Sequence, residues 1–272
     1  MYQIIAYIKF LLKSTNQHGV HSPFVYNLLT KCLYKTEEKS AFKTIRSYRK
    51  ALQLDNRIIS VKDFGAGSRV FKSNERKVSD IAKNAAISTK RALLLNRLTS
   101  YLNIKTALEL GTSLGISSTA ITAGNKVNLT TLEGCPETAN IAREYFNKFG
   151  LKNISLKVGN FDELLSAENF SKGFEIAPPG LEHHKKKHFQ DLIYFDGNHQ
   201  KEATLNYFDQ LLPLAHNDSV FIFDDIHWSK GMEEAWEEIK AHPEVSVSID
   251  SFFWGLIFFR QEQEKEHFTL RL

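Results

Sequence analysis

The chain has 272 residues, of which 42% are apolar and 24% are charged. This length allows one large domain, or a domain of about 170 residues with an appendage of about 100. The composition excludes a disordered, collagen-like or disulfide-rich chain. The two cysteines, Cys32 and Cys135, are too few for a disulfide framework or a four-thiolate zinc site. They fit a reducing cytoplasm, where we expect the protein to reside.

The net charge of +4 conceals two opposite halves. Residues 1–105 carry 20 Lys and Arg against 6 Asp and Glu, a net charge of +14, whereas residues 106–272 carry 15 against 25, a net charge of −10. The basic part has no RNA-binding motif and no ladder of aromatic residues, so we do not expect a nucleic-acid partner. An anionic acceptor and docking against the acidic half both stay open as explanations of the positive charge.

The N-terminus is predicted to form an amphipathic helix over residues 1–13. Its apolar residues recur at helical spacing: Ile4, Ile5, Ile8, Leu11 and Leu12. Such a helix packs on its own domain or on a partner, which leaves a homodimer open, and a membrane-surface helix is the less favoured alternative. No apolar run reaches the ~18–20 residues of a transmembrane helix. Lys9 interrupts the stretch, which also lacks the pattern of a signal peptide.

A mostly helical region follows, with helices expected at 24–34, 38–52 and 78–102. The string His18-Gly19-Val20-His21-Ser22-Pro23-Phe24 opens it. Two histidines cannot fill a metal coordination shell. Ser22 as N-cap and Pro23 at the first helical position explain the Ser-Pro pair better.

A glycine-bearing turn, Asp63-Phe64-Gly65-Ala66-Gly67-Ser68, interrupts the helical region. It lacks both a tight following helix and an acid closing a second strand about 20 residues on, which a dinucleotide site requires. We therefore interpret it as a structural turn. The loop His183-His184-Lys185-Lys186-Lys187 is likewise interpreted as a solvated insertion.

The pattern changes after residue 105, where short β-rich runs alternate with amphipathic helices. Strands are expected at 106–111, 127–134, 154–160, 191–197, 219–225, 245–250 and 253–260, and helices at 115–124, 136–149, 161–169, 200–212 and 231–241. This alternation predicts an α/β fold of right-handed βαβ units around a mostly parallel, seven-stranded sheet. The last two strands are too close for a crossover helix and should form an antiparallel hairpin at the sheet edge. We therefore expect a helical region at 1–104 and a ligand-binding domain at 105–272.

The first of these strands ends in a glycine turn, Glu109-Leu110-Gly111-Thr112-Ser113-Leu114-Gly115. Glycines let the backbone turn tightly and approach a ligand. Glu133 closes the second strand, 22 residues beyond Gly111, where an acid can accept both hydroxyls of a ribose. Because Glu109 would repel a pyrophosphate, the turn favours a cationic or zwitterionic ligand instead.

On these motifs the chain resembles the class I S-adenosylmethionine-dependent methyltransferases, over roughly residues 85–260, and specifically their small-molecule O-methyltransferase branch. The resemblance implies a Rossmann-like fold in which the methionine end of the cofactor meets Glu109, Gly111, Thr112, Ser113 and Gly115. It also implies that Glu133 holds the ribose and that Asn160 and Phe161 border the adenine. A strand end followed by a helix cap is an equal interpretation of these last two residues. The string from His18 to Phe24 resembles the start of a bacterial methyltransferase family.

Carboxylates close the fourth and fifth expected strands, as Asp196 and as Asp224 with Asp225. Neighbouring parallel strands end at one edge of a sheet, so the three should converge, and oxygen ligands suit Mg²⁺, Mn²⁺ or Ca²⁺. His199 lies three residues past Asp196 and could take the proton of an acceptor hydroxyl.

These positions resemble those of the metal-dependent O-methyltransferases, the sugar-modifying macrolide type more closely than the catechol type. The resemblance implies Asp196, Asp224 and Asp225 as metal ligands, and Asp196 and His199 as catalytic residues. In the alternative, Asp196 only contacts the sulfonium side of the cofactor and Asp224 only caps a turn. His227 and Trp228 are expected to wall the acceptor pocket.

The sequence therefore predicts an enzyme that transfers a methyl group from S-adenosylmethionine to an oxygen of a small molecule or sugar, with the help of a divalent metal. Three alternatives stay open. They are a metal-independent N- or O-methyltransferase, an RNA-modifying methyltransferase that uses the basic region, and a non-catalytic adaptor on the same fold.

Overall fold

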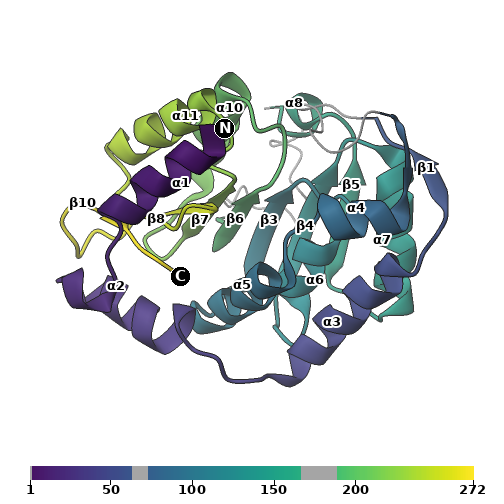
Figure 1. Ribbon diagram of the computed structural model, residues 1–272, viewed down its shortest axis with the longest axis horizontal. Coiled ribbons are helices and arrows are strands. Elements are labelled where there is room, and N and C mark those ends of the chain that lie inside the picture. Colours follow the sequence, from purple (N-terminus) through teal and green to yellow (C-terminus); the bar gives the residue numbers. More distant parts are fainter. Residues whose placement is uncertain (1, 63–72, 167–188) are drawn as a thin grey trace, which may run out of the picture. The chain divides into compact units, whose positions relative to one another are not determined.

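A computed structural model describes residues 2–62, 73–166 and 189–272 (Figure 1). The turn predicted at 63–68 and the loop at 183–187 lie outside the described residues. The chain divides into two compact units, Met1–Glu37 with Asp191–Leu272, and Glu38–Gln190. These units run across the boundary predicted after residue 104, because the helices of residues 38–104 belong with the first predicted strands. The two-domain division at that boundary stays a prediction.

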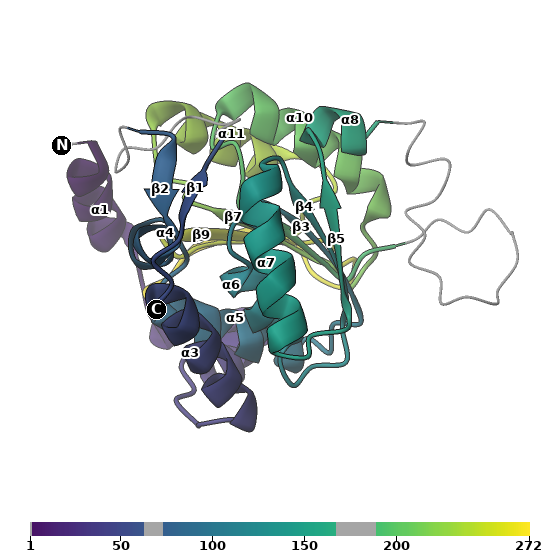
Figure 2. The same cartoon turned by 90° about the vertical axis from the view of Figure 1, so that its right-hand side faces the viewer.

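The unit of residues 38–190 contains three parallel strands, with helices before, between and after them in the sequence. Its helices are α3 (Ser40–Gln53), α4 (Val78–Asn84), α5 (Thr89–Tyr101), α6 (Ile116–Thr122), α7 (Pro136–Lys148) and α8 (Phe161–Leu164). Its strands are β1 (Ile58–Ser60), β2 (Glu75–Lys77), β3 (Thr106–Leu110), β4 (Asn128–Glu133) and β5 (Ile154–Val158). Strands β3, β4 and β5 are parallel neighbours in that order. Helix α7 packs on β4 and β5, as Figure 2 shows.

Two local features of this unit differ from the sequence predictions. The prediction of a single helix at 78–102 is wrong, because the chain forms two helices there, α4 and α5. The Ser88 side chain accepts a hydrogen bond from Arg91 N at 3.3 Å and so caps a new helix start. The antiparallel pair β1–β2 is also new. Each of its strands has three residues, too few to show an alternating pattern.

The helices that precede β3 support the glycine turn and the helix that follows it. Asn96 of α5 donates its side-chain amide to the carbonyl oxygens of Ala120 and Ala123, both at 2.8 Å, at the carboxyl end of α6. Tyr48 of α3 donates its hydroxyl to Leu114 O at 2.9 Å, inside the turn. Carbonyls at the carboxyl end of a helix have no partner within the helix, so the Asn96 amide satisfies two acceptors there. Residues 38–104 are thus an integral part of this unit.

The unit formed by both chain ends contains the remaining elements. Its helices are α1 (Tyr2–Lys13), η1 (Gln17–Gly19), α2 (Pro23–Leu28), the π-helical turn η2 (Leu29–Leu33), α10 (Lys201–Leu211), η3 (Leu212–Leu214) and α11 (Lys230–Ala241). Its strands are β6 (Leu192–Phe195), β7 (Val220–Asp224), β8 (Val247–Asp250), β9 (Trp254–Phe258) and β10 (Glu266–Thr269), in the spatial order β6-β7-β9-β8-β10. β6 and β7 are parallel, and β9 runs antiparallel to both β7 and β8.

Two sequence predictions for this unit are confirmed and one is incomplete. Ser22 caps α2 by accepting from Val25 N, with Pro23 at the first helical position. β8 and β9 form the expected antiparallel hairpin. The hairpin is not the edge, however, because β10 adds to β8 in parallel. The sequence of β10, EHFT, has little apolar character, and Thr15 N holds its end by donating to Thr269 O at 2.9 Å.

In the part of the chain that the structure describes, no helix combines the length and the apolar character needed to cross a membrane.

We predict that Gly115→Ala destabilises the protein far more than Gly150→Ala. Both glycines have left-handed backbones, with φ of 75° and 68°, so alanine is strained at either position by about 1 kcal/mol. A Cβ at Gly115 would also lie 2.4 Å from Phe146 Cε1, whereas a Cβ at Gly150 meets nothing within 4 Å. Urea unfolding should show a loss for Gly115→Ala at least twice that for Gly150→Ala. Equal losses would mean that the packing around the turn is not tight.

Candidate active site

The glycine turn joins β3 to α6 and lies against β4. Gly111 N and Thr112 N both donate to Leu132 O, at 2.9 and 3.1 Å. The backbone is left-handed at Gly111, Ser113 and Gly115, with φ of 104°, 47° and 75°. Because only glycine adopts such angles without strain, two of the three positions need the residue that the sequence supplies. The turn therefore presents its backbone beside the end of β4.

Glu133, the last residue of β4, is bound to this turn through its carboxylate. Ser113 N donates to Oε2 at 2.7 Å, and Cys135 N donates to Oε1 at 2.8 Å. Burial raises the pKa of Glu133, and the backbone N–H groups oppose that rise. A carboxylate has about four acceptor positions, so two backbone donors leave capacity for further hydroxyl donors. The structure thus brings together Ser113 and Glu133, two of the predicted cofactor residues.

Glu109 lies at the other side of the same turn and is fully buried, at 0% exposure. Its Oε2 accepts hydrogen bonds from Ser118 and, at 2.6 Å, from Thr131, which in turn bonds Thr112 at 2.6 Å. Its Oε1 is buried and has no hydrogen-bond partner. Burial raises the pKa of Glu109 to about 7, against the opposing effect of the hydroxyl donors. The sequence analysis missed this polar cluster, although Thr131 is the register partner of Glu109.

Asn160 and Phe161 follow β5, beside the end of β4. Val158 is the register partner of Glu133, and Gly159 N donates to Glu133 O at 3.0 Å. Asn160 Oδ1 accepts from Asp162 N at 3.1 Å and caps α8. Asn160 is thus the capping residue of this segment. The adenine-binding role of both residues stays a prediction.

The other group of predicted residues lies in the unit formed by the chain ends, after β6 and β7. Phe195 and Phe223 are register partners in the parallel pair, so Asp196 and Asp224 end adjacent strands at the same level. Asp224 is buried, and Asp225 has a left-handed backbone, φ 53°, whose N–H donates to Phe253 O at 2.8 Å. His199 Nε2 lies 3.8 Å from Asp196 Oδ1, and the two side chains are 25% and 22% exposed. The predicted pair of catalytic residues is therefore together and reachable by solvent.

A strained turn directs His199 toward Asp196. Asn198 and His199 have consecutive positive φ angles, of 67° and 26°. Asn198 donates its side-chain amide to Tyr207 OH at 3.3 Å, while its Oδ1 is buried without a hydrogen-bond partner. Such backbone strain persists where the surroundings impose it, and it concentrates at functional sites. The sequence analysis gave Asn198 no role, although Asn tolerates the left-handed conformation better than most residues.

The residues do not gather into a metal-binding cluster. Among residues 2–62, 73–166 and 189–272, no group of three or more His, Cys, Asp or Glu side chains is arranged to hold a metal ion. Asp196 and Asp224 end adjacent strands, and the metal site predicted at Asp196, Asp224 and Asp225 stays a prediction.

His227 is fixed on the loop that follows β7. Its Nδ1 lies 2.8 Å from Glu233 Oε1 and its Nε2 lies 3.0 Å from Asp250 Oδ2, while its ring stacks on Phe252 at 5.0 Å. Burial opposes protonation, but the two carboxylates raise the pKa of His227 overall. Both ring nitrogens are thus engaged in a clamp that holds the loop. Trp228, the other predicted wall residue, has its ring 6.3 Å from that of His199.

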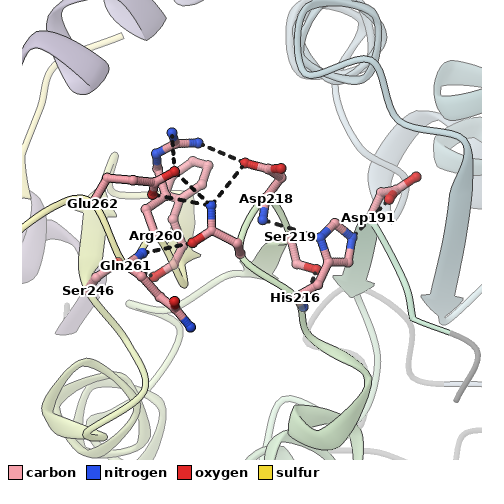
Figure 3. Close-up of polar contacts among 10 residues, drawn as sticks. Asp191, His216, Asp218, Ser219, Ser246, Arg260, Gln261 and Glu262 are labelled. Carbon is pink, nitrogen blue, oxygen red and sulfur yellow. Dashed lines mark hydrogen bonds and ion pairs between the residues drawn. The ribbon is translucent and has the colours of Figure 1, made fainter.

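A cavity of about 390 Å³ opens elsewhere in this unit, before β7 rather than after it. His216, Asn217 and Arg260 contribute to its lining. These side chains are engaged with neighbours: His216 with Asp191 at 2.9 Å, Arg260 with Asp218 at 3.1 Å, and Asn217 with Glu262 at 3.0 Å (Figure 3). Parallel α/β sheets bind ligands beyond the carboxyl ends of their strands, so this cavity is not the candidate active site.

The parallel strands, the glycine turn after β3 and the acid that ends β4 define the class I methyltransferase fold. Residues 108–226 match the model of a family described as "Methyltransferase domain". This part of the chain is therefore similar to methyltransferase domains, and the predicted Rossmann-like α/β fold is confirmed. No curated protein matches the chain in sequence.

Solved structures show the same fold. An O-methyltransferase from Bacillus cereus in complex with S-adenosylhomocysteine (SAH) is 18% identical with a TM-score of 0.53, and the match covers 83% of this chain and 93% of that one. The O-methyltransferase TomG from Streptomyces achromogenes, in complex with S-adenosylmethionine, is 17% identical with a TM-score of 0.53, over 90% and 99% of the two chains. The SAH-bound methyltransferase PaMTH1 from Podospora anserina is 16% identical with a TM-score of 0.55, over 89% and 97%.

We predict that the buried Glu109 makes stability fall as the pH rises. Its pKa is about 7 in the folded protein against 4.5 for the free side chain, so the folded state holds an extra proton between these pH values. The free energy of unfolding should therefore decrease across that window by up to roughly 3 kcal/mol, at about 1.4 kcal/mol per pH unit.

Urea unfolding at pH 5 and pH 8 tests this effect. Glu109→Gln should remove most of the decrease, whereas Glu137→Gln, on the exposed first turn of α7, should leave it unchanged. If Glu109→Gln and the wild-type chain lose the same stability between the two pH values, Glu109 is ionised throughout.

Proposed function

We propose that this protein transfers the methyl group of S-adenosylmethionine to an oxygen of a small-molecule or sugar acceptor. The observation that carries the proposal is the binding of the Glu133 carboxylate by Ser113 N and Cys135 N beside the glycine turn. This arrangement holds a carboxylate at a strand end with acceptor capacity to spare, which suits the two hydroxyls of a ribose. Two of the similar structures are O-methyltransferases in complex with SAH or S-adenosylmethionine.

The roles proposed for the cofactor residues follow from their chemistry. Glu133 accepts the ribose hydroxyls, and Gly111, Thr112, Ser113 and Gly115 provide a turn that the methionine part can approach closely. Glu109 Oε1 is a buried acceptor without a partner, and it supplies a negative field for the ammonium and sulfonium groups. Asn160 and Phe161 follow Val158, the register partner of Glu133, where they border the adenine.

The chemical step requires a better nucleophile than a neutral hydroxyl. S-adenosylmethionine, when bound, supplies an electrophilic methyl group. His199 Nε2 accepts the hydroxyl proton while the acceptor oxygen forms its bond to the methyl carbon and the carbon–sulfur bond breaks, which leaves SAH. Asp196, 3.8 Å from His199, stabilises the imidazolium that results.

A divalent metal at Asp196, Asp224 and Asp225 stays a proposal from the sequence, since the described side chains do not form a three-ligand cluster. Chelation decides between the two mechanisms. Turnover that disappears with EDTA and returns with Mg²⁺ favours the metal, and turnover that persists favours His199 acting without it.

The chemical class of the acceptor and the cellular compartment are proposed from the sequence. A small acceptor is proposed, and an anionic one is favoured by the basic charge of residues 1–105. Both cysteines are buried thiols, which fits a cytoplasmic enzyme.

We predict that SAH binds the protein and that Glu133→Gln weakens this binding at least tenfold. An amide has one acceptor oxygen in place of two, and a hydrogen bond to a charged acceptor contributes about 1.5–3 kcal/mol. Isothermal titration calorimetry gives the dissociation constants. Glu137→Gln, which removes the same charge four residues away on an exposed helix turn, is the matched control.

The outcomes of this titration separate the functions left open by the sequence. If the folded wild-type protein does not bind SAH, the methyltransferase functions are excluded and a non-catalytic adaptor is the alternative that remains. Equal binding by the Glu133→Gln and Glu137→Gln variants would place the ribose elsewhere.

We predict that His199→Gln lowers the turnover number about a hundredfold and leaves the affinity for SAH within twofold of wild type. Loss of a general base typically reduces rates by about 10² to 10⁴. Tritiated S-adenosylmethionine with a panel of catechols, phenols and sugars identifies an accepted oxygen, on which both proteins are then compared. His216→Gln, at the opposite end of β7, is the control for loss of an imidazole. Equal turnover by His199→Gln and wild type would exclude this base.

A further inference from the structure

Helix α1 presents an uncovered apolar stripe. Five large apolar side chains on one side of the helix are between 39% and 83% exposed: Ile4, Ile5, Ile8, Leu11 and Leu12. At 100° per residue they fall within about 120° of the helix circumference, with Ile8 in the middle. Ala6 and Phe10, the buried residues of α1, lie on the opposite side. The stripe therefore faces away from the unit to which α1 belongs.

The contacts that hold α1 on its unit are few. Ala6 and Phe10 form a small buried cluster with Phe252, and Tyr7 adds an edge-on ring contact to Phe252 at 4.8 Å. An isolated helix of about 12 residues is marginal in water, and contiguous apolar patches on soluble proteins usually mark an interaction site. The exposed stripe of α1 therefore indicates a further partner.

The stripe is symmetric about Ile8. Reversing the helix direction around this residue exchanges Ile4 with Leu12 and Ile5 with Leu11, and it returns Ile8 to itself. A twofold interface requires a surface that is complementary to its own copy, so that residue i meets j and j meets i. Two α1 helices packed antiparallel, with Ile8 on the twofold axis, satisfy that requirement over the whole stripe.

The charges at the two ends of α1 favour the same arrangement. Tyr2, at the start of the helix, lies against Glu233, and burial together with the Glu233 and Glu234 carboxylates raises the pKa of Tyr2. The last turn of α1 carries Lys13, and the helix contains no acidic residue. Antiparallel pairing brings Lys13 of the partner subunit to the end of α1 that lies near Glu233. It also aligns the two helix dipoles antiparallel, which is the favourable orientation.

We propose that α1 is a dimerisation helix, which pairs antiparallel with α1 of a second copy of this chain around Ile8. One helix face is a small interface, at the low end of the range of specific protein–protein contacts. The dimer should therefore dissociate within the concentration range of ordinary solution experiments.

Analytical ultracentrifugation of the full chain over increasing concentration tests the association. The wild-type protein should shift from monomer to dimer, and Ile8→Glu should raise the dissociation constant at least tenfold, since it places two like charges on the axis. Leu54→Glu, an equally drastic change at an exposed position outside α1, should leave the constant within twofold. Circular dichroism checks that each variant is folded. A wild-type protein that stays monomeric at every concentration would overturn the proposal.

Cysteine cross-linking tests the antiparallel register. The native cysteines are both buried, so new ones can be examined on their own. Ile8→Cys should form a disulfide-linked dimer under mild oxidation. Leu12→Cys alone should not, whereas Ile4→Cys combined with Leu12→Cys should restore the cross-link. Efficient cross-linking by Leu12→Cys alone would overturn the antiparallel arrangement. A wild-type protein that stays monomeric but sediments with phosphatidylglycerol vesicles would also overturn the proposal. If Ile8→Glu abolishes this sedimentation, the stripe binds a membrane and not a second copy.

Discussion

The candidate cofactor site depends on one carboxylate bound by two backbone N–H groups. Glu133 ends β4 and connects it to the glycine turn through Ser113 and to the start of α7 through Cys135. Each of these backbone groups would otherwise lack a partner within its own element, so the carboxylate satisfies both at once. The same contact fixes the distance between β3 and β4 at their carboxyl ends. The carboxylate of Glu133 therefore links the turn, the strand end and the following helix. It has this structural role whether or not a ligand is bound.

A second, buried polar layer supports this arrangement. Glu109, Ser118 and Thr131 bond one another inside the unit of residues 38–190, and Thr112 joins the cluster from the turn. A buried carboxylate is tolerated only when hydrogen bonds compensate its lost hydration. Hydroxyl donors do so here without a full opposite charge, which keeps the pKa of Glu109 near neutrality. The helices α3 and α5 complete the packing through Tyr48 and Asn96, so the basic N-terminal part of the chain contributes directly to the shape of the turn.

Periodicity and spacing were enough to predict the βαβ order, the cap at Ser22 and the positions of Glu133 and Asp196, because each follows from local sequence or from the ends of parallel strands. Three features depended on information that one local pattern does not contain. The division of residues 78–102 into two helices depends on whether a serine caps a helix or lies within it. Strand β10 exists because it pairs in parallel with β8, although its own sequence has little apolar character. The role of Asn198 depends on two successive left-handed residues, which arise from packing around Tyr207. Each of these features depends on particular hydrogen bonds, so a pattern of apolar residues cannot reveal them.

The pairing of Thr15 with Leu270 joins segments separated by roughly 250 residues, and it bears on how the chain folds during synthesis. The unit of residues 38–190 is continuous in sequence, so its contacts join residues that leave the ribosome within one segment of the chain. The other unit combines residues 1–37 with residues 191–272, so α1 can contact Phe252 only after this distant residue has been synthesised. Until then the apolar side chains of α1, including Ala6 and Phe10, stay accessible. Chaperones that bind short apolar segments can therefore bind α1 before its own unit has folded.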